Sequence, residues 1–409
     1  MTAARTDPCT GPAPLDAAEA VRRWFAAWRP RGGGGERLPL LAADGRVLAG
    51  PVRARVANPA HDLAAMDGIA VTCADTPTGW LAPGAFDVVD TGDPIPPGRD
   101  AVVPRELLDR GPGDLVGLVG LVGLSEPPTP GRHVRRAGED VAAGELLLPA
   151  GHRLRPVDLA VLASAGHATV EVTRAPRVVV IPTGDEIREA GTRPRRGEIV
   201  DSNSVLIAAT LARRGAVVER TAIVPDVPER LAAVVRAAAD RADLVLVIAG
   251  SSAGRDDHTA AVVRAVGAVC VHHLPLRPGH PVLLGTAGTE APVPLVGVPG
   301  YPVAAARITR DFAEAALDRV EGTARRPGPT VTAVLTRAVA SAAHTDEEVL
   351  VSVHDGAASP LPRGAGALTS LMRASGVVRS PLGGEGWAAG DEVVVETRPG
   401  APLTGGRHR

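Results

Sequence analysis

The second half of the chain alternates between short runs that are apolar throughout and longer segments with helical periodicity. Three such apolar runs are RVVVIP at 177–182, DLVLVIAG at 243–250 and PVPLVGVPG at 292–300. Between them, apolar residues recur every third or fourth position, for example over 203–214 and 228–241. Strands that are apolar on both faces and alternate with helices are typical of a parallel sheet covered on both sides. We therefore predict a multidomain α/β protein with a doubly wound, Rossmann-like domain in this region.

The pattern outside this region predicts smaller β-rich parts. From about residue 37 to residue 150, Gly, Pro and Asp interrupt short apolar runs about every 8–12 residues. Within that stretch, the repetitive LVGLVGLVGL at 115–124 predicts a strand or a hairpin. Helical periodicity predicts helices over 16–28 and over 156–166, the second ending at Gly166. After the charged segment at 324–329, alternating apolar residues predict a small C-terminal β-domain.

The composition excludes several classes of chemistry. Among the 409 residues there is no lysine, so all 44 basic side chains are arginines, against 46 acidic ones. A P-loop, a Schiff-base enzyme and a lysine general base are therefore ruled out. Any anion must be held by arginine or by protonated histidine. The net charge of -2 and an aromatic content of 2% argue against a nucleic-acid-binding protein.

The cysteines and the apolar segments help to predict the cellular compartment of the protein. Cys9, Cys73 and Cys270 are widely spaced, which argues against a disulfide framework and a structural zinc site. The first residues lack the apolar core of a signal peptide. No uninterrupted apolar stretch approaches the ~20 residues that cross a bilayer. We expect a cytoplasmic protein that does not bind membranes.

The loops that follow the predicted strands carry the candidate chemistry, because ligands of doubly wound sheets bind at the carboxyl ends of the strands. These loops contain TGDE, GSSAGRDD, RPGHP and GVPGYP, and the acids Asp185, Glu186, Asp226, Asp256 and Asp257. Carboxylates at neighbouring strand ends could hold Mg²⁺ beside a substrate phosphate. For any one of these acids, the alternative is a solvated loop residue or a helix N-cap.

Two further features extend this argument. Arg277 in RPGHP suits bidentate contact with an oxyanion, and His280 could assist it, although a surface histidine without function is the alternative. His272 and His273 lack further ligands at metal spacing and are interpreted as structural. In the first half, Asp67–Gly68 alone indicates a hairpin turn, with Met66 as core filler. The residues by themselves thus indicate an anionic, phosphorylated ligand with a divalent metal at one sheet edge.

Taken together, the motifs resemble the molybdopterin molybdenumtransferase (MoeA-type) family, which includes the gephyrin E domain. AMDGIAV is similar to the family's SAMDGYAV, and TGDPIPPGRDAVVPRE to its TGAPxPxGxDAVVxxE. VRRAGEDVAAGELLLPAG resembles RxxGEDxxxGxxxxxxG, PTGDEI resembles STGDEL, IVDSN resembles IYDSN, and GSSAGRDDHT resembles GGVSVGxxDxT. RPGHP and VPGYPVAA correspond to KPGKP and LPGNPVSA, as in a branch with PGHP and PGYP. The matches run in order along the chain, from AMDGIAV at 65–71 to VPGYPVAA at 298–305.

The resemblance implies a fold and a reaction. It implies an elongated homodimer of four-domain chains: a linker domain (1–50 and 141–175), an inserted β-rich domain (51–140), the doubly wound molybdopterin-binding domain (176–325) and a C-terminal barrel-like β-domain (326–409). The substrates would be molybdate and adenylylated molybdopterin. AMP would be released and molybdenum inserted into the dithiolene with the help of Mg²⁺. Contact with a molybdopterin adenylyltransferase is also implied.

The resemblance also implies roles for particular residues. The catalytic acids would be Asp67, Asp140, Glu186, Asp226 and Asp257, with Glu186 and Asp257 as metal ligands and Asp67 supplied by the partner subunit. The substrate-binding residues would lie in the matching motifs: Thr91, Thr183, Gly184, Ser202, Asn203, Gly250, Ser251, Ser252, Gly254, Arg277, Gly279, His280, Pro299, Gly300 and Pro302.

Departures from the family pattern lie on the oxyanion side. Arg277 and His280 replace both lysines of KPGKP, Tyr301 replaces the asparagine of PGNP, and Ala304 replaces the following serine. These changes leave open whether the oxyanion is molybdate or tungstate. They also leave open a non-catalytic molybdopterin-binding or scaffold protein, although a pure binder would not need Glu186 and Asp257 beside a phosphate. An adenylyltransferase that uses only the doubly wound domain would leave the motifs before residue 175 unexplained.

Overall fold

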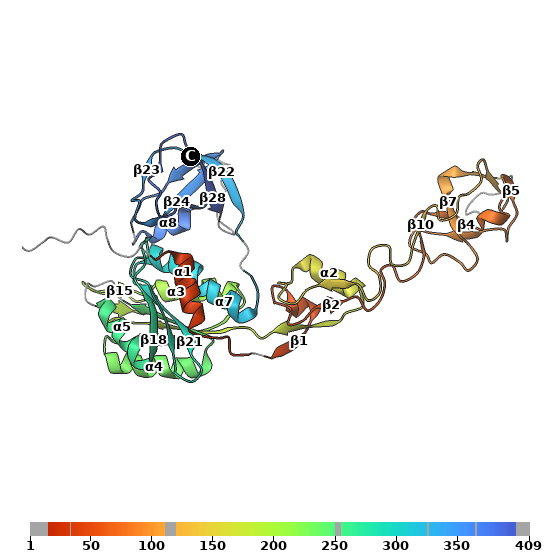
Figure 1. The fold of residues 1–409 in the computed structure, drawn as a ribbon. Coiled ribbons are helices and arrows are strands. Elements are labelled where there is room, and N and C mark those ends of the chain that lie inside the picture. Colours follow the sequence, from red (N-terminus) through yellow and green to blue (C-terminus); the bar gives the residue numbers. More distant parts are fainter. Residues whose placement is uncertain are drawn as a thin grey trace, which may run out of the picture. The chain divides into compact units, whose positions relative to one another are not determined.

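The computed structural model describes residues 15–32, 34–110, 120–249, 255–324, 327–364 and 366–397, without the side chains of 110 and 255–257. Two compact units divide the chain (Figure 1). One unit is Gly35–Thr173, and the other combines Met1–Gly34 with Arg174–Arg409. The second unit contains the α/β sheet and a C-terminal barrel.

The sheet of the second unit has six strands within the described chain, in the order β16-β13-β17-β21-β20-β18. Its strands are β13 (Arg177–Pro182), β16 (Val217–Arg220), β17 (Leu244–Ala249), β18 (Gly267–His272), β20 (Leu283–Ala287) and β21 (Val293–Pro299). The first four strands in this order are parallel, as predicted, whereas β20 runs antiparallel to both of its neighbours. The predicted all-parallel sheet is therefore mixed.

Helices cover both faces of this sheet because alternate strand residues point to opposite sides. Val178 and Val180 pack with α1, α3, α6 and α7, whereas Val179 and Ile181 pack with α4 and α5. Figure 1 shows α4 and α5 on one side of the strands and α1, α3 and α7 on the other. The helices are α1 (Ala17–Ala26), α3 (Asn203–Arg213), α4 (Pro228–Arg241), α5 (Arg255–Val266), α6 (Pro302–Ile308) and α7 (Glu314–Glu321). A π-helical segment, Thr309–Ala313, joins α6 to α7.

Helix α1 belongs to this sheet and not to the linker in which we expected residues 1–50. Ala20, Trp24 and Trp28 lie on one face of the helix or just beyond its end, and all three are buried against the sheet. The indole Nε1 of Trp24 donates a hydrogen bond of 2.7 Å to the carbonyl of Gly285 in β20. Burying these two large aromatic side chains explains why the helix packs here.

A barrel follows the sheet in the same unit. Its described strands close a ring in the order β24-β25-β22-β28-β26, since β24 pairs with both β25 and β26. Apolar side chains from these strands fill its core. The elements are β22 (Thr330–Leu335), β23 (Val339–Ala340), β24 (Asp346–His354), β25 (Ala357–Pro360), α8 (Leu368–Arg373), β26 (Gly376–Ser380), β27 (Gly386–Trp387) and β28 (Glu392–Thr397). A short strand from the sheet region, β19 (Leu276–Arg277), pairs in parallel with β24.

The unit of Gly35–Thr173 is built from small sheets with separate apolar cores. Its strands are β1 (Gly35–Pro39), β2 (Val52–Arg53), β3 (Leu63–Ala64), β4 (Gly68–Val71), β5 (Gly79–Leu81), β6 (Asp87–Val89), β7 (Ala101–Pro104), β8 (Leu108–Arg110), β9 (Val122–Leu124), β10 (Val134–Arg135), β11 (Leu146–Leu148) and β12 (Thr169–Thr173). Its helices are the 3₁₀ turns Leu40–Ala43, Cys73–Asp75 and Arg105–Leu107, and α2 (Pro156–Ser164). Of the repetitive segment at 115–124, residues 115–119 lie outside the described chain, and β9 is the predicted strand.

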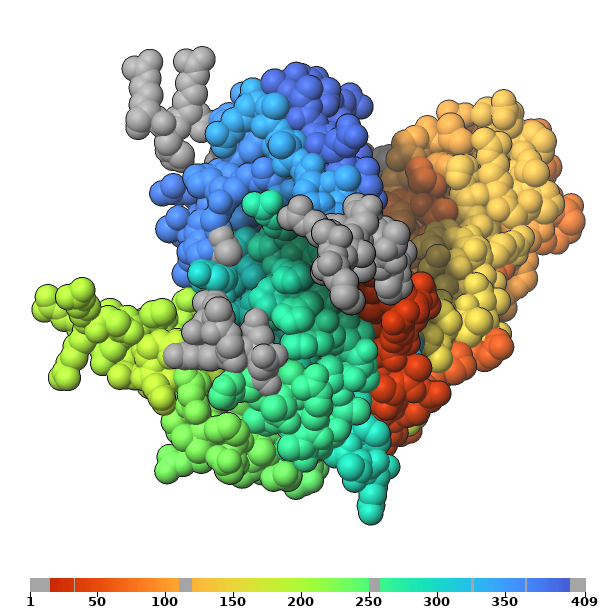
Figure 2. All heavy atoms as spheres, turned by 60° about the vertical axis from the view of Figure 1, so that its left-hand side comes forward, coloured from red at the N-terminus to blue at the C-terminus, as the bar shows by residue number. Residues whose placement is uncertain are grey.

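One segment of the second unit extends away from its sheet. The short parallel strands β14 (Ile187–Arg188) and β15 (Ile199–Val200) are joined by a connection whose residues 189–197 are all exposed. Figure 2 shows this yellow-green segment projecting from the rest of the unit. Its first strand, β14, directly follows Glu186 in the sequence. Across the described chain, no helix is long and apolar enough to cross a membrane.

Candidate functional site

The turn after β13 holds Thr183 and Gly184 against two neighbouring segments. The backbone N–H and the hydroxyl of Thr183 both donate to the carbonyl of Ile248 at the end of β17, at 3.1 and 2.9 Å. The N–H of Gly184 donates to the carbonyl of Val224 at 3.1 Å. Gly184 has φ +138°, and a Cβ there would lie 2.7 Å from Cγ1 of Ile187, so glycine is required. Both residues therefore lie at the carboxyl edge of the sheet, as predicted.

The turn after β21 joins the same edge. The side-chain amide of Asn203, the first residue of α3, donates to the carbonyl of Gly300 at 2.7 Å. Asn203 is buried, and its Oδ1 has no hydrogen-bond partner among the described residues. Pro302 opens α6. The predicted residues Asn203, Pro299, Gly300 and Pro302 are thus brought together, with Ser202 at the N-cap position of α3.

The acidic side of the edge contains Glu186 and Asp226. Oδ1 of Asp185 accepts a hydrogen bond of 3.2 Å from the backbone N–H of Asp226, which joins the two acidic turns. Glu186 is half-buried and Asp226 is exposed. Asp257 lies in the first turn of α5, after β17. Its side chain lies outside the described part of the chain, as do the predicted ligands Gly250, Ser251, Ser252 and Gly254.

The RPGHP loop runs from β19 to β20 on the same side of the sheet. Gly279 has φ +117°, and a Cβ there would lie 3.1 Å from Cδ1 of Ile308 in α6. Nδ1 of His280 lies 2.7 Å from the carbonyl of Leu274, which requires a proton on Nδ1. The carbonyl of His280 accepts from the N–H groups of Leu274 and Val282, at 3.1 and 2.9 Å. The loop is therefore fixed at both ends.

The side chains of this loop differ in exposure and contacts. The guanidinium-bearing side chain of Arg277 is 69% exposed, and its Nε lies 3.9 Å from Oε1 of the buried Glu347. The ring of His273 stacks on that of His280 with centroids 5.2 Å apart, and the rings of His272 and His273 are 3.9 Å apart. Arg277 is thus held weakly and remains open to an anion.

In the other unit, Asp67 and Thr91 form a pair. Oδ1 of Asp67 accepts hydrogen bonds from both the backbone N–H and the hydroxyl of Thr91, each 2.7 Å long. These two bonds, the backbone bond first, lower the pKa of Asp67 below its ordinary value. Asp67 is therefore an exposed, oriented and ionised carboxylate at neutral pH.

The local signal at Asp67–Gly68 indicated a hairpin turn with Met66 in the core, and this interpretation is wrong. Gly68 is the first residue of the buried strand β4, and Met66 is 39% exposed. A Cβ on Gly68 would lie 2.0 Å from the carbonyl oxygen of Val103 in the paired strand β7. The glycine permits close backbone approach, which leaves Asp67 exposed at the strand end.

Asp140 occupies a different part of the same unit. Its Oδ2 accepts a hydrogen bond of 2.8 Å from Nδ2 of Asn58, a residue that our sequence analysis did not single out. Asn58 also pairs with Val141 through the backbone. Among the described hydrogen bonds, none links Asp140 to Asp67. Each carboxylate has its own support.

These features define a multidomain α/β protein whose candidate site lies at a sheet edge, and comparisons with known proteins identify its family. Three family models match in order: the MoeA N-terminal region (domain I and II) over 15–166, a probable molybdopterin binding domain over 179–319, and the MoeA C-terminal region (domain IV) over 332–397. The chain belongs to the molybdopterin molybdenumtransferase family, as the motifs indicated.

Individual relatives support this assignment. Over 333 residues the chain is 34% identical to molybdopterin molybdenumtransferase 2 of Mycobacterium tuberculosis, which covers 74% of this chain and 80% of the relative. It is 32% identical over 288 residues to the molybdopterin molybdenumtransferase of Haemophilus influenzae, covering 66% and 69%. The crystal structure of a molybdopterin biosynthesis MoeA protein from Pyrococcus horikoshii is 27% identical, with a TM-score of 0.79, and covers 94% of this chain and 98% of that one. The predicted multidomain fold is confirmed.

Proposed function

We propose that the protein inserts molybdenum into molybdopterin, with adenylylated molybdopterin and molybdate as substrates and AMP as a product. The observation that carries this proposal is the convergence of Thr183, Asn203 and Gly300 with the acidic turns at one sheet edge. Backbone and amide groups there can bind an anionic ligand. Carboxylates on the adjoining turns could hold a cation beside a bound phosphate. The family membership of the whole chain supports the same reaction.

Mg²⁺ fits the donors at this edge. It prefers carboxylate oxygens and is usually held by one or two of them together with substrate phosphates. Glu186 would hold the ion together with Asp257, and Asp226 lies on the adjoining turn. When bound, Mg²⁺ would neutralise charge that develops on the phosphate as the adenylyl group leaves. The protein itself orients the phosphate through Thr183, Gly184 and the first residues of α3.

The RPGHP loop would bind the metal oxyanion. The exposed guanidinium of Arg277 can make two parallel hydrogen bonds to an oxyanion. His280 can donate only from Nε2, because Nδ1 is used by the carbonyl of Leu274. Molybdate and tungstate present the same kind of oxygen to these groups, so comparing the two substrates would identify the physiological one.

We also propose that Asp67 of one subunit contributes to the site of a second subunit. Asp67, oriented by Thr91, would close the site of a second subunit, so the protein would act as a homodimer. Asp140 would contribute from the same unit. We further propose that the protein works in the cytoplasm and receives its substrate from a molybdopterin adenylyltransferase.

The direct test is to incubate the purified protein with adenylylated molybdopterin, Mg²⁺ and either molybdate or tungstate. We expect AMP release together with metal incorporation into the dithiolene, and chelation of Mg²⁺ should abolish both. Tight binding of the substrate without AMP release would contradict the enzyme and favour a non-catalytic scaffold. That second candidate is suggested by the altered residues Arg277, His280 and Tyr301.

A prediction follows from the geometry of His280. Because Nδ1 contacts the carbonyl of Leu274 at 2.7 Å, only Nε2 is left to face the oxyanion. His280→Ala should therefore raise the KM for molybdate by about tenfold, roughly the loss of one hydrogen bond to a charged group. His280→Lys keeps a hydrogen-bond donor and should raise this KM less. An unchanged KM in His280→Ala would show that His280 does not bind the oxyanion.

A further inference from the structure

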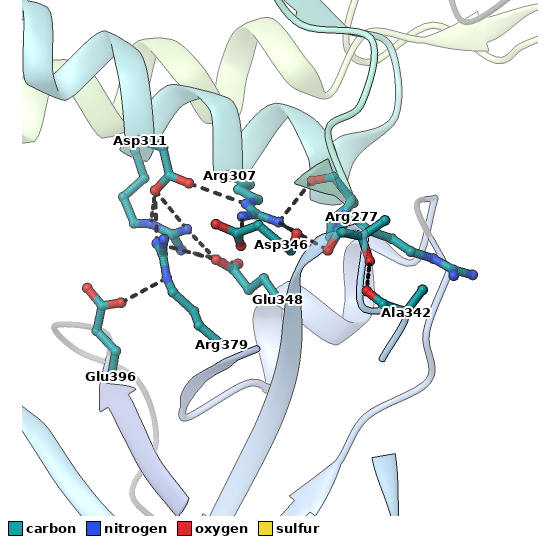
Figure 3. Close-up of polar contacts among 11 residues, drawn as sticks. Arg277, Arg307, Asp311, Ala342, Asp346, Glu348, Arg379 and Glu396 are labelled. Carbon is teal, nitrogen blue, oxygen red and sulfur yellow. Dashed lines mark hydrogen bonds and ion pairs between the residues drawn. The ribbon is translucent and has the colours of Figure 1, made fainter. Parts of the chain in front are cut away.

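The main chain of the RPGHP loop is held by a buried arginine that belongs to a different element. Arg307 lies in α6, and its residue is 1% exposed. Its Nη1 donates to the carbonyls of Arg277 and Pro278, at 3.1 and 3.4 Å, and to the carbonyl of Asp346 at 2.9 Å (Figure 3). One guanidinium nitrogen thus joins the loop to the first residue of the barrel strand β24.

Two carboxylates compensate the charge of Arg307. Its Nη2 donates to Oδ1 of Asp346 at 2.5 Å, and its Nε donates to Oδ2 of Asp311 at 3.3 Å. A buried cation is tolerated only when it is paired and hydrogen-bonded in this way. All three nitrogens are therefore used inside the protein, so Arg307 does not contact substrate.

The loop and the barrel are also joined through their backbones. Leu276 and Arg277 of β19 pair in parallel with Asp346 and Glu347 of β24. The N–H of Asp346 donates to the carbonyl of Pro275 at 2.7 Å. The same barrel strand therefore holds the start of the loop and supplies the counterion of Arg307.

This arrangement sets the direction of the loop's side chains. With its carbonyl fixed by Arg307, Arg277 extends its guanidinium away from the buried cluster (Figure 3). At the other end, Gly279 packs on Ile308, the residue next to Arg307. Helix α6 thus fixes both the residue before and the residue after the Pro278 turn.

We propose that Arg307 is a positioning residue for the oxyanion site and that, through Asp346, the C-terminal barrel is part of the support of that site. Arg307 acts through Arg277 and His280, whose orientation depends on the loop carbonyls it holds. The proposal rests on the proposed function in one respect: it takes the oxyanion to be bound by this loop.

The kinetic test compares Arg307→Gln with Arg310→Gln. Arg310 lies in the same buried cluster and pairs with Glu348 and Asp311, but no described hydrogen bond links it to the loop. We expect Arg307→Gln to raise the KM for molybdate about ten- to a hundredfold with little change in kcat, because small displacements of binding groups have effects of this size. Arg310→Gln should leave this KM near that of the unmodified protein. Equal changes in KM for the two variants would overturn the proposal.

A double variant tests whether Arg307 acts through Arg277. If it does, adding Arg307→Gln to Arg277→Ala should worsen the KM for molybdate much less than Arg307→Gln does alone. Fully additive effects would contradict the proposal. If Arg307→Gln does not fold, Asp346→Asn weakens the same support more mildly and should change KM in the same direction, against an unchanged control, Glu348→Gln.

Hydrogen exchange separates this proposal from the proposed function. Peptides covering 273–283 contain the amides of Leu274 and Val282, both bonded to the carbonyl of His280. They should exchange faster in Arg307→Gln than in Arg310→Gln, whether or not the protein releases AMP. Unchanged exchange in Arg307→Gln would overturn the positioning role. Changed exchange in a protein that never releases AMP would instead reject the proposed function.

Discussion

Glu186→Gln is expected to lower the rate of AMP release by about a hundredfold or more, the size of effect seen when a group that stabilises transition-state charge is removed. The substitution keeps the size of the side chain and removes its negative charge. Glu186 is half-buried in the turn that leads from β13 to β14, and its carbonyl accepts a hydrogen bond of 2.9 Å from Ile199. The turn is therefore held by its backbone, and the variant should fold normally.

Single-turnover AMP release measured over a range of Mg²⁺ concentrations would test this expectation. The rate should fall and the Mg²⁺ concentration at half-maximal rate should rise. Glu189→Gln is the matched control, since Glu189 lies three residues later in the exposed connection and pairs with Arg220 at 2.9 Å. Its rate should stay close to that of the unmodified protein. An unchanged Mg²⁺ dependence in Glu186→Gln would show that this carboxylate does not bind the metal.

The parallel part of the sheet could be predicted because its signals are local. β13, β17 and β21 are apolar along their whole length, and α4 begins at a proline where the sequence indicated. The direction of β20 could not be predicted in this way. Its run, LLGTA, is short and contains glycine and threonine, and its antiparallel pairing depends on partners on both sides. Strand direction depends on the neighbouring strands and cannot be predicted from the apolar pattern of one strand alone.

Some features of the candidate site could likewise be predicted from the sequence, and others could not. Thr183, Asn203 and Gly300 could be placed at one edge because the carboxyl ends of parallel strands meet there. The role of Gly68 could not be inferred, since an Asp-Gly pair has the same local signature in a turn and at a strand end. Close approach of Val103 decides between them, 35 positions further along the chain.

The burial of Arg307 could not be predicted from the local sequence pattern. It stands between Ala305 and Ile308, which face the core, and a charged residue in a helix is ordinarily expected to face solvent. The one signal was Asp311, four residues later, which can pair on the same helical face. The carbonyls and Asp346 that make burial possible come from other elements.

Arg310→Met is expected to destabilise the unit that contains the sheet and the barrel by about 3–5 kcal/mol, the usual cost of removing one partner from a buried ion pair. Arg310 donates to Glu348, whose side chain is 1% exposed, and to Asp311 (Figure 3). Burial alone would raise the pKa of Glu348, but the charges of Arg310 and Arg307 lower it below its ordinary value. In the variant, Glu348 keeps only Arg379, at 3.5 Å, as a close partner among the described ion pairs.

The loss of stability in Arg310→Met should become smaller as the pH falls. In the unmodified protein the lowered pKa values of Glu348 and Asp311 mean that their stabilisation is present above about pH 4.5 and is lost as the pH falls below the ordinary carboxyl range. Without Arg310, the buried Glu348 should bind a proton more readily, so the stability gap between the two proteins should narrow from pH 7 to pH 4. Calorimetric unfolding at several pH values measures this gap. A gap that stays constant would show that the charge of Glu348 is not what Arg310 stabilises.

Two further variants test whether charge pairing accounts for the loss of stability. Arg22→Met removes an arginine from an exposed pair with Glu19 and should leave the free energy of unfolding nearly unchanged, because exposed pairs contribute little. Replacing both Arg310 and Glu348 by methionine should recover part of the loss, since no uncompensated charge then remains between them. A double variant as unstable as the sum of its single variants would mean that the cluster stabilises the protein through packing and not through charge pairing.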